Sequence, residues 1–273
     1  FLPWAILMYV ALFTKIKAVF NQIARKQQEW YSLCGTLPAL LMFSFSGFQL
    51  PYYTNILFPF LAILTAAFVM QLNEKGIKRT AILQGVIIGI IVAGIIALYF
   101  FYQPAITSVY AFVLLCVLLL FIFAFPFVIR TDLLQSVLLR SALAVLFIGQ
   151  FLSGLFYPDA LQYQSGNHMA YYLNRNLPGL PAASGELYIP VGQFYLDRYI
   201  RITPIDTICK KDFVRPSVVF ISATELDQLK QTGSAYEIVK EFPEYHITMP
   251  NLKFINQATR AKTLKKQYLV KLL

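Results

Sequence analysis

The chain has 273 residues, of which 58% are hydrophobic and only 13% are charged, and its mean hydropathy is +0.61. These values indicate an integral membrane protein and exclude an ordinary soluble enzyme. The net charge of +10 would suggest nucleic acid binding in a soluble protein, but in a membrane protein basic residues set the orientation, so no nucleic acid partner is expected.

Six apolar runs predict membrane-spanning helices. A spanning helix needs about 20 apolar residues, and the last four runs reach that length. The first run is too short, so we expect the sequence to begin within a helix and to be a fragment of a longer protein. In chain order the runs are 1–13, 31–43, 52–72, 80–101, 105–129 and 137–157.

The joints between these runs alternate in charge. Two joints, 44–51 and 101–104, have no charged residue. Because basic loops stay in the cytoplasm, we predict that the neutral joints and everything after 157 lie outside. This makes a multi-pass protein of the cell inner membrane with an extracytoplasmic C-terminal part. The basic joints hold Lys15, Lys17, Arg25 and Lys26, then Lys75, Lys78 and Arg79, then Arg130 and Arg140.

The first basic joint has two interpretations. Ile16, Val19, Phe20 and Ile23 recur at helical spacing among the basic residues, which favours an amphipathic helix on the inner leaflet. A basic connector that only sets the orientation explains the same residues.

The composition changes near Asp159, after which charges become frequent and apolar runs shorten to strand length. We therefore expect an α-helical polytopic membrane bundle over 1–157 and a small extracytoplasmic α/β domain over 158–273. The expected elements are a helix from Ser165 through His168, Tyr171, Tyr172 and Arg175, a second helix over 224–231 capped by Ser222 or Thr224 and ended by Gly233, and strands over 186–189, 217–221, 238–242 and 245–249.

The polar half offers few candidates for chemistry. His168 and His246 have no carboxylate or cysteine at a ligand spacing, so no metal site is expected. Cys34, Cys116 and Cys209 are too scattered to pair by any sequence argument. A basic tail over 260–271 would attract anionic lipid or glycan, or would be a solvated helix face with Arg260, Lys262, Lys265 and Lys266.

The neutral joint at 44–53 is the main candidate site. Hydroxyl, amide and phenol groups gather there without any charge, between two apolar runs. Polar groups at a membrane boundary are costly unless they are hydrogen-bonded, so the cluster predicts a site for a lipid head group. A plain turn with interfacial aromatic residues is the alternative.

The same residues carry a family resemblance. Phe43-Ser44-Phe45-Ser46, then Gln49-Leu50-Pro51-Tyr52-Tyr53, then Pro59 resemble the Ser-rich, Lys-Leu-Pro-His-Tyr, Pro segment of the GT-C membrane glycosyltransferases. That family includes the protein O-mannosyltransferases and the lipid A aminoarabinose transferase. The order of spans and outer domain is similar to its C-terminal half. Gln49 replaces the usual Lys and Tyr52 the usual His, which weakens any charge pairing with a phosphate.

The resemblance implies transfer of a sugar from a polyprenyl-phosphate carrier to a glycan, lipid or protein acceptor on the outer face. It places the catalytic carboxylate in a first outer loop before Phe1, so no catalytic residue is expected here. Any divalent metal would bind to that preceding part. Gln49, Tyr52, Tyr53 and Asn55 would meet the carrier's phosphate or the sugar.

The alternative function is a non-enzymatic envelope transporter or assembly scaffold. Ion-coupled transporters usually place ionisable groups inside their spans. We expect no charged side chain in the interior of any span, which argues against transport.

Overall fold

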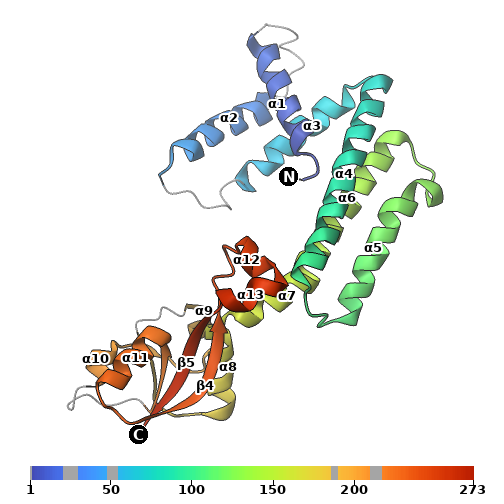
Figure 1. Ribbon diagram of the computed structural model, residues 1–273. Coiled ribbons are helices and arrows are strands. Elements are labelled where there is room, and N and C mark those ends of the chain that lie inside the picture. Colours follow the sequence, from blue (N-terminus) through green and yellow to red (C-terminus); the bar gives the residue numbers. More distant parts are fainter. Residues whose placement is uncertain (1, 21–29, 48–54, 186–189, 210–216) are drawn as a thin grey trace. The chain divides into compact units, whose positions relative to one another are not determined.

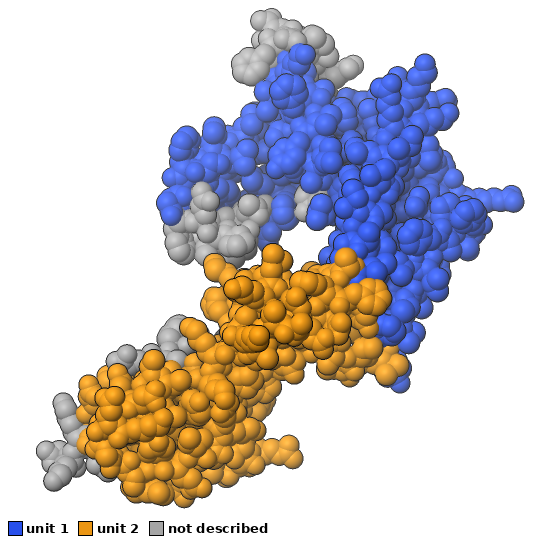
Figure 2. Space-filling model, viewed as in Figure 1, with its two compact units in different colours: residues 1–96, 110–151 blue, residues 97–109, 152–273 orange. Residues whose placement is uncertain are grey.

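The computed structural model describes residues 2–20, 30–47, 55–185, 190–209 and 217–273 (Figure 1). The chain divides into two compact units, drawn in blue and orange in Figure 2. Unit 1 comprises residues 1–96 and 110–151, and unit 2 comprises residues 97–109 and 152–273. Residues 97–109, which the sequence assigns to the membrane part, thus belong with the C-terminal unit.

Unit 1 is helical. Its helices are α1 (Ala5–Phe20), α2 (Trp30–Phe45), α3 (Phe58–Met70), α4 (Glu74–Tyr102, whose last residues belong to unit 2), α5 (Val109–Val128) and α6 (Leu133–Phe151). In the described part, three helical runs are long and apolar enough to cross a membrane, namely Glu74–Tyr102, Val109–Val128 and Leu133–Tyr163. The runs expected at 80–101, 105–129 and 137–157 fall on these three.

The expected span over 52–72 does not form one helix across its described residues. Residues 52–54 lie outside the described part, Asn55 and Ile56 form a 3₁₀ turn, and α3 has 13 residues. Pro59 stands in the first turn of α3, where its fixed φ and missing N–H favour a helix start. The helix therefore begins later than apolar length alone suggests.

Helix α1 packs against α3. At one end Met8 packs with Leu57 and Leu61 in a buried cluster, and at the other the Nζ of Lys15 donates to Oε1 of Gln71 at 3.3 Å. Lys15 is thus a buried residue of α1 rather than part of a separate surface helix. Residues 21–29, the rest of the expected amphipathic segment, lie outside the described part.

Helix α2 also packs on α3. Ala39 and Phe43 of α2 contact the buried Met8, Leu57 and Leu61 cluster. A Cβ added to Gly35 would come within 3.0 Å of the Phe60 ring, so a small residue is required at this contact.

Helices α5 and α6 form an antiparallel pair. The Nε2 of Gln150 donates to the Ala111 carbonyl at 3.1 Å, and the Nε of Arg140 donates to the Ile122 carbonyl at 3.3 Å. The expectation that Arg140 belongs to a joint, with no charge inside a span, is wrong because this guanidinium lies within α6 and bonds to the neighbouring helix.

Unit 2 contains a five-stranded mixed sheet in its described residues. The strand order is β2-β1-β3-β5-β4, with β1 parallel to β2 and β3, and β5 antiparallel to β3 and β4. The strands are β1 (Ala182–Ser184), β2 (Arg201–Ile202), β3 (Val218–Ser222), β4 (Tyr236–Glu244) and β5 (Lys265–Leu272). This is the mixed α/β fold expected after the helical part.

Helices cover the sheet and connect it to α6. A π-helical turn (Leu152–Phe156), α7 (Tyr157–Ala160) and a 3₁₀ turn (Leu161–Tyr163) lead from α6 to α8 (Ser165–Asn176). The remaining helices are α9 (Pro190–Tyr195), α10 (Ile205–Ile208), α11 (Ala223–Gln231), α12 (Leu252–Ile255) and α13 (Gln257–Arg260), followed by a 3₁₀ turn (Ala261–Thr263).

Strand β3 organises two cores because its successive side chains point to opposite faces. Val218 and Phe220 join Met169 and Leu173 of α8 in one buried cluster. On the other face, Val219 and Ile221 pack with α10 and α11. Burial on both faces explains why β3 reads as a continuous apolar run.

Several expected elements of unit 2 are confirmed. Helix α8 and strands β3 and β4 occur where the sequence predicts them. Ser222 caps α11 in a capping box with Glu225, and Gly233 follows the helix at φ 69°, the left-handed conformation expected of a helix stop.

Two expectations are wrong, and one falls outside the described part. Residues 245–249 form turns rather than a strand. The basic tail is not a solvated helix face, because β5 lies between β3 and β4 and buries Gln267, Leu269 and Val270. Residues 186–189, an expected strand, are not described.

Candidate functional site

The neutral segment predicted as a site joins the end of α2 to the start of α3. Gln49, Tyr52 and Tyr53 lie outside the described residues. Asn55 is exposed in the turn before α3. Ser44 lies in the last turn of α2 and donates its hydroxyl to the Leu40 carbonyl at 2.7 Å. The structure therefore describes the two flanks of the candidate site and leaves its centre as a prediction.

The residues next to the two ends of α3 differ in charge. The contact between Lys15 and Gln71 lies at its C-terminal end, and the chain then enters α4 through Lys75 and Lys78. The buried cluster around Leu57 lies at the N-terminal end of α3, which follows the neutral segment in the chain. Lys15, Lys75 and Lys78 thus lie near the C-terminal end of α3, and in the chain the neutral segment precedes the N-terminal end.

An apolar cavity of 390 Å³ extends along α3. Thr65 is the one residue with a hydroxyl group among the described lining residues, and that hydroxyl already donates to the Leu61 carbonyl at 2.6 Å. The lining residues are Leu2 and Trp4 near the start of the chain, Ala62, Thr65, Ala66, Val69 and Met70 of α3, and Leu134 and Leu138 of α6. Such a surface suits a hydrocarbon chain rather than a polar ligand.

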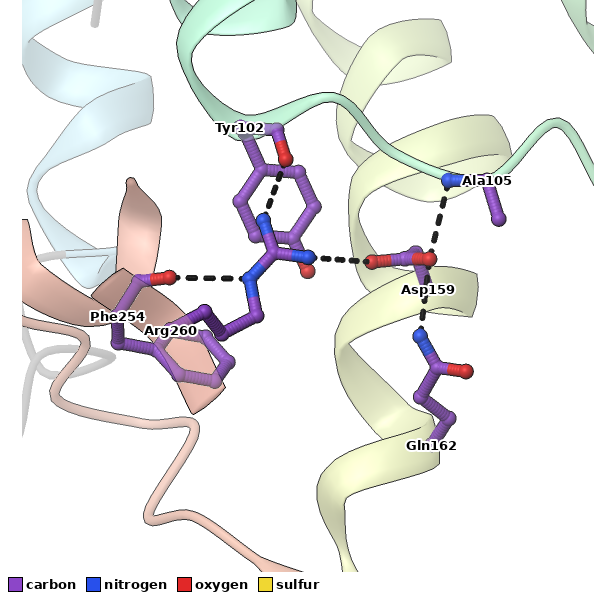
Figure 3. A network of polar contacts seen from close by, with 6 residues as sticks. All are labelled: Tyr102, Ala105, Asp159, Gln162, Phe254 and Arg260. Atoms are coloured by element: carbon purple, nitrogen blue, oxygen red, sulfur yellow. Dashed lines mark hydrogen bonds and ion pairs between the residues drawn. The ribbon is translucent and has the colours of Figure 1, made fainter. Parts of the chain in front are cut away.

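Unit 2 contains a buried polar cluster that sequence reasoning missed (Figure 3). The guanidinium of Arg260 lies 3.6 Å from Oδ2 of Asp159, donates its Nε to the Phe254 carbonyl at 3.1 Å, and also donates to the Tyr102 carbonyl. Its Cζ stands 4.0 Å from the centre of the Tyr102 ring. Oδ1 of Asp159 accepts from the Ala105 amide at 3.0 Å and from the Gln162 side chain at 2.9 Å.

This cluster is an anchor rather than a reaction site. The side chains of Asp159 and Arg260 are only 3% and 8% exposed, so the opposite charges neutralise each other away from water. Arg260 satisfies the last carbonyl of α4 and ties α13 to it. The expectation of a solvated Arg260 is corrected here. The sequence contains one signal for this pair. Asp159 is a single carboxylate directly after the last apolar run, and a buried carboxylate needs a cation beside it.

The described residues contain no group of three or more His, Cys, Asp or Glu side chains that could hold a metal ion. The Nε2 of His246 forms a hydrogen bond with the Thr248 hydroxyl at 2.7 Å. All three cysteines are free.

No family model matches the sequence, and no match was found among curated proteins or solved structures. The class of protein is therefore defined by the architecture itself. It combines a helical unit, with helices long and apolar enough to cross a membrane, and a small mixed α/β unit.

Proposed function

We propose that the chain is the C-terminal part of an integral membrane glycosyltransferase. The enzyme would transfer a sugar from a polyprenyl-phosphate carrier to an acceptor on the outer face of the cell inner membrane. The observation that supports the proposal is the contrast between the two sides of α3: in the sequence an uncharged Ser- and Tyr-rich segment leads into Asn55, whereas the Lys15–Gln71 contact lies at the C-terminal end of the helix.

The proposed orientation follows from this polarity. Basic residues stay on the cytoplasmic side, so the end of α3 near Gln71 is cytoplasmic and the Asn55 end faces outward. Helix α4 begins at Glu74, contains Lys75 and Lys78 in its first two turns, and ends at Tyr102 in a neutral joint. The chain reverses direction between α5 and α6, near the basic Arg130, so this connection is cytoplasmic. Helix α6 then leads back to the outer side, where unit 2 follows.

The donor would lie with its phosphate at the neutral segment and its prenyl chain along α3. The Gln49 amide and the phenols of Tyr52 and Tyr53 are neutral donors suited to phosphate or sugar oxygens. The 390 Å³ apolar cavity, which includes Ala62 and Val69, offers a surface for the chain within the membrane. The catalytic carboxylate, and any divalent metal, would belong to the part before Phe1.

Transfer of radiolabelled sugar by the intact protein, with single substitutions in the segment, tests this proposal. Gln49→Ala and Tyr53→Phe should each lower transfer by about tenfold, the usual cost of losing one hydrogen bond to a charged group. Tyr110→Phe is the matched control, because Tyr110 is 89% exposed in the first turn of α5, shortly after the other neutral joint. Wild-type turnover in both segment variants would remove this site assignment.

One observation favours the transporter alternative. Arg140 is an ionisable residue inside a helix that is apolar enough to span a membrane, and such residues often mark transport paths. If the protein transferred no sugar from a panel of carriers, a transporter or an assembly scaffold would be the better-supported function.

A further inference from the structure

Helix α8 has two distinct faces. Met169 and Leu173 are buried in the core of unit 2. Other residues of the helix line an open cavity of 430 Å³, namely His168, Tyr171, Tyr172, Arg175 and Asn176. Tyr172 also packs against the core cluster. His168, Tyr171 and Arg175 are exposed.

Strand β4 forms the facing wall with Lys240, Glu241, Phe242 and Pro243, and Gln162 completes the lining. The Nζ of Lys240 lies 4.5 Å from the centre of the Tyr172 ring, which holds the ammonium in the cavity. Glu241 forms an ion pair with Lys266 at 2.8 Å, so its negative charge is compensated.

Arg175 is a second cation of this cavity, on the α8 side. It is exposed, and no described residue forms a hydrogen bond or ion pair with its guanidinium. A planar guanidinium binds a carboxylate through two parallel hydrogen bonds. With Lys240 and Arg175 both present and Glu241 paired, the cavity favours an anionic ligand.

An exposed aromatic row continues from the cavity. The Tyr171 and Tyr195 ring centres are 5.2 Å apart, and those of Tyr195 and Phe194 are also 5.2 Å apart. Tyr171 is 57% exposed and Phe194 is 81% exposed. Contiguous exposed aromatic surface of this kind marks an interaction site.

We propose that unit 2 binds an acidic oligosaccharide in the cavity between α8 and β4. A uronic acid carboxylate would pair with Arg175, and the side-chain oxygen of Asn176 would accept a hydrogen bond from a sugar hydroxyl. The apolar faces of the following sugar rings would pack on Tyr171 and Tyr195. The inference rests on unit 2 alone and does not depend on the transfer reaction proposed above.

A lipid surface is the competing occupant. Cations beside exposed aromatic residues also occur at membrane interfaces. The concave shape and the side-chain amide oxygens of Gln162 and Asn176 favour a ligand that carries many hydroxyl groups over a flat lipid surface. The cavity therefore suits a saccharide better than a membrane surface.

Calorimetric titration of the intact protein in detergent tests the proposal, with trigalacturonate as the probe. Maltotriose serves as the neutral sugar and inorganic phosphate as the simple anion. Arg175→Gln and Tyr171→Ala should each weaken trigalacturonate binding by at least about tenfold, since a charge-assisted hydrogen bond or a stacked ring is lost. Unchanged melting temperatures would verify that the variants are folded.

The matched controls are Arg201→Gln and Tyr199→Ala. Arg201 is exposed on β2, at the opposite edge of the sheet from β4, and Tyr199 is 80% exposed. Both should bind trigalacturonate like the wild type. The proposal is overturned if the wild type does not bind trigalacturonate, if phosphate or maltotriose binds equally well, or if the controls lose as much affinity. Arg175-dependent binding only to anionic phospholipid vesicles would show a membrane contact instead.

Discussion

Arg140 of α6 donates a hydrogen bond at 3.3 Å to the carbonyl oxygen of Ile122 in α5. In a regular helix this carbonyl would accept from the amide of residue 126, but that residue is Pro126, which has no N–H. The guanidinium therefore supplies the missing donor. In an apolar environment such a replacement is important, because water cannot satisfy the carbonyl.

Loss of this guanidinium should destabilise the protein. We predict that Arg140→Leu lowers the free energy of unfolding in detergent by about 1–3 kcal/mol, the cost of an unsatisfied buried carbonyl. The loss should be smaller in a Pro126→Ala background, where the residue 126 amide restores the helical hydrogen bond. Equal losses in the two backgrounds would contradict this role, and Arg130→Leu, at an exposed residue, is the control.

Removal of Arg260 should be more costly. Arg260→Met leaves the Asp159 carboxylate buried without a cation, which typically costs about 3–5 kcal/mol of stability. Adding Asp159→Asn should recover part of this loss, because the uncompensated charge disappears. Thermal unfolding of both variants and of Lys262→Met, an exposed neighbour, gives the comparison. A loss no larger than that of the control would contradict the anchoring role.

Two glycines of unit 2 should differ in their tolerance of alanine. A Cβ on Gly192 would stand 2.7 Å from the backbone oxygen of Gly166, so α8 and α9 would have to separate, at a cost of about 1–3 kcal/mol. A Cβ on Gly185 would collide with Oε1 of Glu225, and a movement of the Glu225 side chain can relieve this clash. That movement disturbs the α11 cap and should cost about 1 kcal/mol.

Chemical denaturation of the two alanine variants would check this order. Gly149→Ala is the control, because an added Cβ there has no neighbour within 4 Å. A Gly192→Ala protein as stable as the control would show that the α8–α9 contact is not a close backbone approach in solution.

The proposed orientation predicts which residues react with a membrane-impermeant maleimide on intact cells. In a background without native cysteines, Ser46→Cys should react from outside, because it lies at the neutral end of α2. Lys78→Cys at the start of α4 should react only after the membrane is opened. The reverse pattern would invert the proposed topology.

Elements whose signals are local could be predicted from the sequence. Helix α11 is the clearest case, since Ser222, Glu225 and Gly233 mark both of its ends. Strand β5 was missed because its lysines suggest a solvated surface. Its burial comes from pairing with β3 and β4, which are distant in sequence. The shorter α3 was also missed, because apolar length does not reveal where a helix begins.

The candidate site was only partly predictable. The neutral segment from Ser44 to Asn55 is contiguous, so its composition was visible in the sequence, whereas its geometry at Gln49, Tyr52 and Tyr53 stays a prediction. The Asp159–Arg260 pair joins residues far apart in the chain. Contact between residues so distant in sequence depends on the fold, so no pattern of spacing in the sequence predicts this ion pair.

The proposed function depends on sugar transfer from a polyprenyl-phosphate carrier by the intact protein. This transfer is measured by following radiolabel from such a carrier to an acceptor, using the purified intact protein and a variant in which the acidic residue expected in a first outer loop before Phe1 is replaced by its amide. We expect transfer by the wild type and its loss in the variant. Equal transfer by both proteins, or none by the wild type with a panel of common carriers, would contradict it.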